Sequence, residues 1–239
     1  LFGNGIVNDK GPMACFLIAA KAIKNAGITL KGDLLLTAVS GEIERAPVDE
    51  FQDTKYLSHE IGARSMVAHG VIADYALIAE ATNFYHAWLE AGEAVFEVSL
   101  FAHCPLYAPY IDRPYPLEKN PNAIVQMAKL IDTIEDWALD YQKQNTYTSP
   151  GGTLIPTVNI GAIRGGSPHN TCVTSELCSI YVDFRTAPNQ DVLAIKAKLE
   201  DIIQELRLKG KVELYAFRRG YEAQNIDRLA RAIEKAHYR

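Results

Sequence analysis

The sequence of 239 residues lacks the features that mark several large classes of protein. No apolar run approaches the length that crosses a membrane, and there are no internal repeats or low-complexity segments. Basic residues are not in excess, because Lys and Arg total 24 against 29 for Asp and Glu, a formal net charge of −5. With 48% hydrophobic and 22% charged residues, the chain has the composition of a soluble globular protein. We therefore expect neither nucleic acid nor a membrane as a partner.

Cysteine is also scarce. The four cysteines, Cys15, Cys104, Cys172 and Cys178, show no CxxC pairing and are too few for a disulfide scaffold. We expect free, buried thiols in a reducing compartment, which indicates the cytoplasm. No signal peptide is visible, but the first residues read like the middle of a domain, so the missing leader carries no weight.

The first 87 residues read as alternating helices and strands. Pro12 fits the first turn of a helix that ends at Gly27. Residues 33–39 (DLLLTAV) and 75–79 are almost continuously apolar, as strands buried on both faces of a parallel sheet are. A short helical stretch is expected between them, at 64–69. This order predicts an α/β layer structure.

The pattern changes after residue 87. It predicts a ferredoxin-like domain, because strands and helices follow in the order β-α-β-β-α-β. The strands are expected at 94–101, 153–163, 177–184 and 212–217, and the helices over 121–138, capped by Asn120-Pro121, and 192–206. A further helix begins near 226. We expect two domains, an α/β domain over 1–87 and 218–239 and a ferredoxin-like insert over 88–217.

Four polar residues occupy places where a sheet of this kind binds ligands. Glu42 and Glu80 follow the two predicted strands, and Asn8 and Asp9 lie in the turn before the first helix. Because ligands bind at the carboxyl ends of open parallel sheets, we expect these groups to meet. Carboxylates brought together repel unless a proton or cation joins them, and a divalent metal is a natural partner. Each residue also has a simpler explanation, as a helix cap or a solvated charge.

Six motifs resemble those of the zinc-dependent amidohydrolases and metallopeptidases, a family that includes acetylornithine deacetylase, succinyl-diaminopimelate desuccinylase, aminoacylase and carnosinase. They occur in the family's order at 3–12, 32–42, 79–82 (AEAT), 121–124 (PNAI), 165–170 (GGSPHN) and 182–185 (VDFR). The resemblance implies a zinc-peptidase-like α/β/α catalytic domain with an inserted ferredoxin-like βαββαβ lid, which usually mediates homodimerisation. It also implies a chain that is incomplete at both ends, because the family's first metal histidine would precede Leu1 and its last would follow Arg239.

The metal-site motifs depart from the family pattern. Asn8, followed by Asp9, stands where the family has an aspartate that bridges two metals. Glu42 matches the general base, but Ile43 stands where the family has a metal-binding glutamate; a shift of one residue would instead make Glu42 the ligand. In the first register both losses fall on the second metal, and the first keeps Glu80 and Asn8, with Asp9 as a substitute ligand. We expect one or two divalent ions per subunit, zinc or else manganese or cobalt.

Three residues of the predicted lid match family positions that contact substrate. His103 resembles a histidine that reaches the partner subunit's site and stabilises the oxyanion. Asn170 resembles an asparagine that contacts substrate near the metals. The planar fork of Arg185 suits a substrate carboxylate, although we expect it first to pair with Asp183 or another carboxylate of the lid.

Three functions remain open for a small-molecule substrate. The first is hydrolysis of an amide bond in an N-acyl amino acid or dipeptide, by metal-activated water with Glu42 as general base. The second is hydrolysis of an unusual C–N bond, such as one on an aromatic amine, in a pocket lined by Tyr85, Trp88, Tyr107, Tyr110 and Tyr115. The third is a metal-free homologue that only binds a ligand. Metal content separates the third from the others, and a substrate panel separates the first two.

Overall fold

The computed structural model describes residues 5–42, 61–80, 82, 83 and 85–237. The chain divides into two compact units, Leu1–Ala87 with Asn225–Arg239, and Trp88–Gln224. The second unit is therefore inserted within the first along the sequence. Within the described ranges, no helix is both long and apolar enough to cross a membrane.

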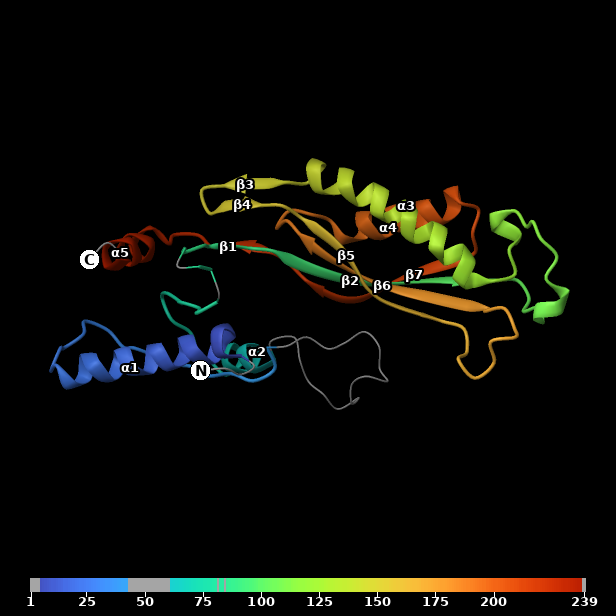
Figure 1. The fold of residues 1–239 in the computed structure, drawn as a ribbon. Coiled ribbons are helices and arrows are strands. Elements are labelled where there is room, and N and C mark those ends of the chain that lie inside the picture. The colour runs from blue at the N-terminus through green and yellow to red at the C-terminus, as the bar shows by residue number, and fades with distance from the viewer. Residues whose placement is uncertain (1–4, 43–60, 81, 84, 238–239) are drawn as a thin grey trace. The chain divides into compact units, whose positions relative to one another are not determined.

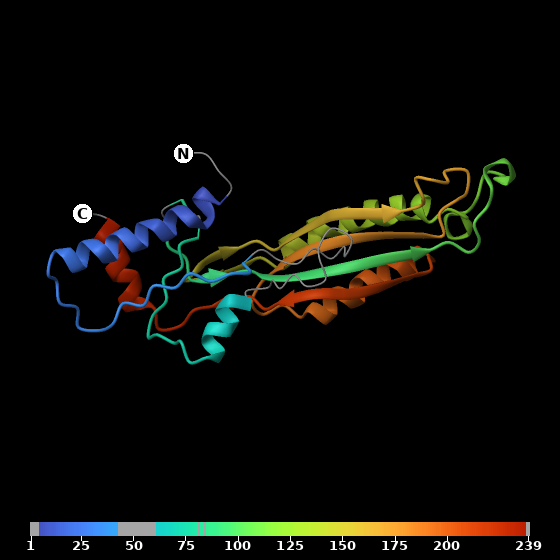
Figure 2. The ribbon, with the colours of Figure 1, turned by 90° about the horizontal axis from the view of Figure 1, so that it is seen from below.

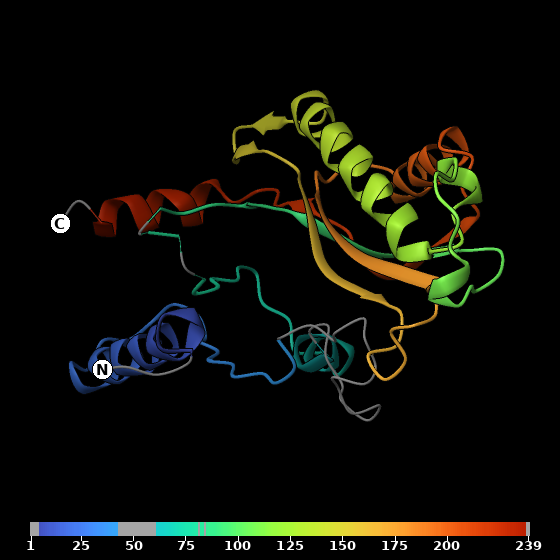
Figure 3. The same cartoon turned by 45° about the vertical axis from the view of Figure 1, so that its right-hand side comes forward.

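The second unit is built on a four-stranded antiparallel sheet. Its strands lie in the order β5-β6-β2-β7, which Figure 2 shows from the side opposite the helices. Two helices, α3 and α4, join β2 to β5 and β6 to β7, and both cover the same face of the sheet (Figures 1 and 3). The bounds are β2 Gly92–Phe101, α3 Ala123–Gln144, β5 Thr157–Gly165, β6 Leu177–Thr186, α4 Val192–Glu205 and β7 Gly210–Arg218. This is the β-α-β-β-α-β order that the sequence predicted.

The core lies between the sheet and its two helices. Along β2 and β6 every second side chain points toward the helices, as the two-residue period of a strand requires. Phe96 and Phe184, from these two strands, are fully buried and meet edge to face, with ring centroids 5.6 Å apart. Tyr141 of α3 packs edge-on against the Phe184 ring at 5.7 Å. The other fully buried apolar side chains here are Ala94, Val98, Leu100, Ala123, Met127, Leu130, Ile134, Cys178, Ile180 and Val182.

Two boundaries differ from the sequence prediction. The side chain of Asn122, not Asn120, caps α3, because its Oδ1 accepts a hydrogen bond of 3.0 Å from the Ile124 amide. The single strand expected over 153–163 is two strands, β4 (Gly152–Leu154) and β5, separated at Pro156. Proline has no N–H to donate to a strand ladder, so pairing stops there. The segment before Pro156 turns back instead and pairs with β3 (Tyr147–Ser149).

A short two-stranded ribbon joins the first and the last residues of the second unit. β1 (Leu89–Glu90) pairs antiparallel with β8 (Tyr221–Glu222), and the Ala223 amide donates 2.8 Å to the Trp88 carbonyl. Glu222 also holds the β3–β4 hairpin, because its carboxylate accepts from the Tyr147 hydroxyl at 3.0 Å and from the Gly151 amide at 3.3 Å. The two chain segments that enter and leave this unit are therefore tied together.

The first unit contains three helices in its described part. They are α1 (Gly11–Asn25), preceded by a π-helical turn η1 (Ile6–Lys10), α2 (Ile61–Ala68) and α5 (Asp227–His237). The strands predicted at 33–39 and 75–79 were wrong for this structure, because both segments lack strand pairing. An apolar run becomes a strand only when a neighbour supplies hydrogen bonds, and here Leu35 is 55% and Ile78 71% exposed.

All four cysteines are free, as predicted, but only Cys178 is buried. Cys15 lies on α1, which has no buried residue, and Cys104 and Cys172 lie in loops. The prediction of buried thiols was therefore wrong for these three. Burial raises the pKa of the Cys178 thiol to about 11, so this sulfur is protonated at neutral pH.

Candidate functional site

The turn before α1 presents Asn8 and Asp9 next to each other. Asn8 interrupts η1 with non-helical angles of φ −124° and ψ 97°, and the peptide bond between the two residues is cis. Asn8 is exposed, whereas Asp9 is partly buried. Neither side chain caps α1, since the residue at the cap position is Lys10 and no side-chain cap bond forms. The simpler explanation of these two residues as helix caps is therefore wrong.

The surroundings of Asp9 disfavour the negative charge of its carboxylate. Burial, and then the negative charge of Glu80, raise the pKa of the Asp9 carboxyl. Its Oδ1 is buried and accepts no hydrogen bond within the described part of the chain. A carboxylate that is desolvated, repelled by a second carboxylate and short of a donor is stabilised by a cation. The structure thus places the charge of Glu80 near enough to act on Asp9, although 71 positions of sequence separate the two residues.

The other predicted parts of this site are not joined to that pair. Glu42 is exposed, and Glu80 rather than Glu42 is the charge that acts on Asp9. Ile43 lies outside the described residues. Over residues 5–42, 61–80 and the rest of the described chain, no group of three or more His, Cys, Asp or Glu side chains is placed to hold a metal. Asp9, Glu80 and the Asn8 amide have the oxygen atoms and the charge that suit a divalent cation, and they would supply only part of the ligands of such an ion.

In the second unit, the loops that carry His103 and Asn170 leave the same end of the sheet. β2 ends at Phe101 opposite Leu177, the first residue of β6, and β5 ends at Gly165 beside Cys178. The first loop follows β2, and the second connects β5 to β6. Because neighbouring strands are antiparallel, both candidates lie at this one end.

Main-chain hydrogen bonds join these two loops. The Ala102 amide donates 2.8 Å to the Glu176 carbonyl, and the Ala108 amide donates 2.7 Å to the Cys172 carbonyl. Between them, Tyr107 forms an isolated antiparallel bridge with Val173. The loops are thus held side by side, which supports His103 and Asn170 as parts of one surface.

Asn170 is held in place within its loop. Its amide donates 3.1 Å to the Ser167 carbonyl, and its side-chain Oδ1 accepts from the Cys172 thiol at 2.8 Å. Asn170 and His103 are both exposed, so both are open to a ligand. In the His103 loop, the rings of Tyr107 and Tyr110 lie 6.0 Å apart and are 51% and 72% exposed.

The aromatic residues proposed from the sequence do not form a single pocket. Trp88 precedes β1 and lies against Gly151, whereas Tyr107 and Tyr110 follow the far end of β2. The ten residues of β2 span about 33 Å in extended conformation. Tyr115 accepts a hydrogen bond from the Asp112 amide within its own loop, and Tyr85 belongs to the first unit. Only the Tyr107–Tyr110 pair remains as a candidate aromatic surface.

Arg185 lies at the opposite end of the sheet. It is eight positions after Leu177 on β6, a separation of about 26 Å along an extended strand. Its guanidinium pairs with Asp183 at 2.8 Å, as predicted, and with Glu93 of β2 at 3.0 Å. Glu93 was not predicted as part of a site, since its partner Arg185 is 92 positions away. It lies just before the predicted strand 94–101, and β2 also carries Glu97 and Ser99, so its charge alone did not set it apart.

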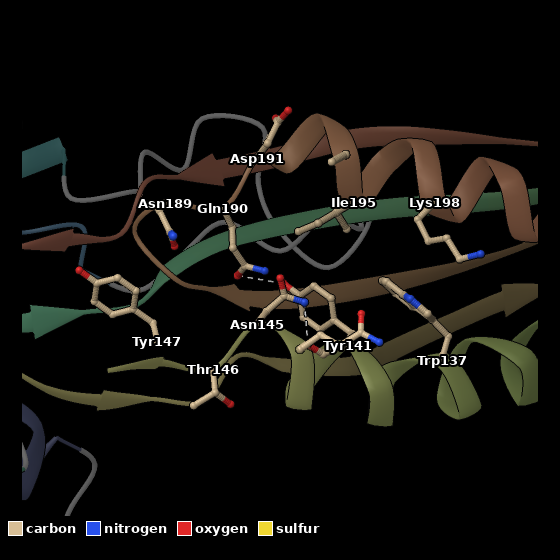
Figure 4. Close-up of a pocket in the computed structure, with 12 residues that line it drawn as sticks. Trp137, Tyr141, Asn145, Thr146, Tyr147, Asn189, Gln190, Asp191, Ile195 and Lys198 are labelled. Carbon is tan, nitrogen blue, oxygen red and sulfur yellow. Dashed lines mark hydrogen bonds between the residues drawn. The ribbon is translucent and has the colours of Figure 1, made fainter. Parts of the chain in front are cut away.

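A groove of about 420 Å³ lies between the end of α3 and the start of α4 (Figure 4). Two hydrogen bonds join polar groups of its lining. The Tyr141 hydroxyl donates to Gln190 Oε1 at 3.1 Å, and the Asn145 side-chain amide donates to the Tyr141 carbonyl at 2.7 Å. Burial raises the pKa of Tyr141 to about 12. The groove contains none of the predicted site residues, and the Tyr141–Gln190 bond ties α3 to the segment that precedes α4.

Comparisons with known proteins find a matching domain and two similar enzymes. Residues 116–211 match the model of the peptidase dimerisation domain. The chain is 26% identical over 211 residues to N-formyl-4-amino-5-aminomethyl-2-methylpyrimidine deformylase of Bacillus subtilis (strain 168), covering 86% of this chain and 45% of the relative. It is 25% identical over 206 residues to the [LysW]-lysine/[LysW]-ornithine hydrolase of Saccharolobus solfataricus, with 86% and 46% covered. This chain spans less than half the length of both relatives.

Among solved structures, the chain is similar to an amidase of the hydantoinase/carbamoylase family from Burkholderia multivorans, at 17% identity and a TM-score of 0.43, over 63% of this chain and 33% of that one. The dimerisation-domain match contains α3, β5, β6 and α4 complete. Both curated relatives match over most of this chain, beyond that domain. The chain therefore carries a peptidase dimerisation domain and is similar to amidohydrolases over most of its length, in agreement with the resemblance of its six ordered motifs.

Proposed function

We propose that the protein hydrolyses an amide C–N bond in a small N-acylated amine, amino acid or dipeptide and uses a divalent cation, zinc in the first place. The Asp9–Glu80 pair carries the proposal, since the buried Asp9 Oδ1 lacks a donor and Glu80 adds a second negative charge. The relatives support the same reaction class, because one is named a deformylase and the other a hydrolase.

The chain's own residues would divide the chemistry between them. The metal, when bound, supplies Lewis acidity to the substrate carbonyl and the attacking water. Asp9 and Glu80 provide carboxylate oxygens for it, and Asn8 a neutral amide oxygen. Glu42 accepts the proton of the attacking water and delivers it to the leaving nitrogen. His103 donates a hydrogen bond to the oxyanion, and Asn170 orients the acyl group.

The two units would have different tasks. We assign the catalytic α/β role to Leu1–Ala87 with Asn225–Arg239, and the role of an inserted ferredoxin-like lid to Trp88–Gln224. Arg185 lies about 26 Å along β6 from Leu177, the residue opposite the end of β2 that precedes the His103 loop, so one lid would not bring both side chains to one small substrate. A homodimer resolves this conflict, because one subunit can supply Arg185 to a site that receives His103 from its partner.

The edge strand β5 suits such a dimer better than β7. Edge strands that carry lysine and other charges resist pairing with a second chain. β7 carries Lys211, Glu213 and Arg218, whereas Arg164 is the one charged residue of β5. The exposed Ile163 of β5 adds apolar area to this edge. The strand also lies wholly within the dimerisation-domain match.

Metal content of the full-length protein tests the proposal. We expect at least one equivalent of divalent metal per subunit by elemental analysis, and its loss in Glu80→Ala. Asp74→Ala is the matched control, because it removes an exposed acid of the same unit and should keep the metal. Absence of metal after reconstitution would leave only a binding function. Two equivalents would mean that Asp9 compensates for Asn8 and Ile43.

A second substrate class is favoured by one observation. Tyr107 and Tyr110 are exposed in the loop that also carries His103, so an aromatic amine could stack beside the candidate oxyanion donor. We expect N-formyl and N-acetyl derivatives of aromatic amines to be hydrolysed faster than aliphatic ones of similar size. The Tyr110→Ala variant should lose this preference, and a preference that persists would remove the tyrosines from the site.

A further inference from the structure

Two carboxylates already occupy the guanidinium of Arg185. Asp183 Oδ2 accepts from Arg185 Nε at 3.2 Å and from Nη2 at 2.8 Å, and Glu93 Oε1 accepts from Nη2 at 3.0 Å. The Nε–Nη2 edge is one on which arginine binds a carboxylate through two parallel hydrogen bonds. A substrate carboxylate that approached this edge would have to displace Asp183.

Glu93 is fixed in this arrangement. It lies on the inner strand β2, where the register places it opposite Arg185 on one side and Arg218 on the other. Its side chain is only 3% exposed, so its charge depends on these partners. With Asp183 included, the row holds two positive and two negative charges. It offers no surplus positive charge to an anion.

The same row contains an unsatisfied acceptor. Asp183 Oδ1 is buried and accepts no hydrogen bond from a described residue, while Oδ2 is used by Arg185. A carboxylate that approached this row would bring a third negative charge next to Asp183 and Glu93, whereas an amine or a neutral group would not.

We infer that Glu93 and Asp183 are specificity-determining residues, which make the Arg185 end of the site disfavour substrates with a free carboxylate and accept amines and neutral groups. This inference rests on the proposed amide hydrolysis with Arg185 facing the substrate. The inference predicts that Arg185 does not bind a substrate carboxylate here and instead holds the carboxylates of Glu93 and Asp183. Glu93 acts through Arg185 and is a positioning residue.

The test compares substrate pairs that differ only in one carboxylate. N-formyltyramine with N-formyltyrosine, and N-acetyltyramine with N-acetyltyrosine, are assayed with the metal-loaded, full-length protein. We expect a higher kcat/KM for the carboxylate-free member of each pair. Glu93→Gln and Asp183→Asn should each raise the relative kcat/KM of the carboxylate member by about tenfold, which corresponds to about 1.4 kcal/mol. Glu97→Gln, on the same strand and face, is the matched control and should keep the wild-type ratio.

The outcomes separate this inference from the proposed function. A wild-type preference for the carboxylate member, or a ratio that neither variant changes, overturns the inference and leaves amide hydrolysis intact. No turnover of either pair by metal-loaded protein contradicts the proposed function, and the inference falls with it. If Glu93→Gln does not fold, Asp183→Asn still decides the question, because Asp183 is 29% exposed and its removal leaves Glu93 paired with Arg185.

Discussion

Nη2 of Arg185 lies 3.0 Å from Oε1 of Glu93, a carboxylate whose side chain is 3% exposed. Removal of one partner of such a pair leaves a buried charge with less compensation. We expect Arg185→Ala to lower the free energy of unfolding by about 2–4 kcal/mol, somewhat below the cost of breaking a fully buried pair, because the arginine itself is 39% exposed. Urea denaturation followed by circular dichroism measures this change.

An exposed ion pair provides the control for this prediction. Lys129 and Asp132 of α3 lie 2.6 Å apart, but their side chains are 50% and 63% exposed. Lys129→Ala should change the stability by less than about 1 kcal/mol, because water screens such pairs. Equal losses in Arg185→Ala and Lys129→Ala would show that Glu93 does not depend on its arginine.

The Glu222 carboxylate gives the ribbon of β1 and β8 a pH dependence. Hydrogen bonds from the Ser149 side chain, the Tyr147 hydroxyl and the Gly151 amide lower the pKa of Glu222 below its ordinary value of 4.5. A lowered pKa stabilises the folded form above the ordinary value, and this stabilisation is lost as the pH falls through the lowered one. We expect the NMR shift of the Gly151 amide to titrate below pH 4.5.

The variant Glu222→Gln should abolish that titration, and Glu213→Gln on β7 should leave it in place. The same contact raises the pKa of the Tyr147 hydroxyl above its ordinary value of 10.0. The stabilisation that this hydrogen bond gives to the folded form is therefore present at neutral pH, and it is lost only as the pH rises through the raised pKa of Tyr147. A Gly151 amide that still titrates in Glu222→Gln would assign the effect to another acid.

The aromatic cluster around Phe184 should dominate the stability of the second unit. Phe184 is fully buried, and the rings of Phe96, Tyr141 and Trp137 lie within 5.9 Å of its centroid. We expect Phe184→Ala to cost about 3–5 kcal/mol, because it removes apolar contacts and leaves a cavity. Unfolding can be followed by tryptophan fluorescence, because Trp137 lies beside Phe184. Leu193→Ala, at a position 66% exposed, should change stability by no more than about 0.5 kcal/mol.

The sequence predicted the parts of this fold that depend on local patterns. Alternating apolar residues in β2 and β6 and the helical stripe of α3 stay within one element, so their periods identify the elements directly. Residues 33–39 show the limit, because their apolar character matches a buried strand but pairing requires a partner that local sequence does not contain. The interactions Glu93–Arg185 and Asp9–Glu80 join distant positions, and only the fold reveals them. Without the family resemblance, Asp9 would have remained a candidate helix cap.

The edge of β5 gives the last prediction. Ile163 is 55% exposed on this strand, and Ile124 of α3 lies over Gly165 at the strand's end and is 42% exposed. If two copies pair along this edge, Ile163→Lys places a charge where apolar side chains and backbone groups of the partner must approach. We expect the variant to sediment as a monomer at concentrations where the wild type is a dimer. Tyr215→Lys makes the same change on the opposite edge strand, β7, and should remain dimeric. A monomeric Tyr215→Lys together with a dimeric Ile163→Lys would show that the interface lies at β7. His103 would then have to reach the partner's site from the other edge of the sheet.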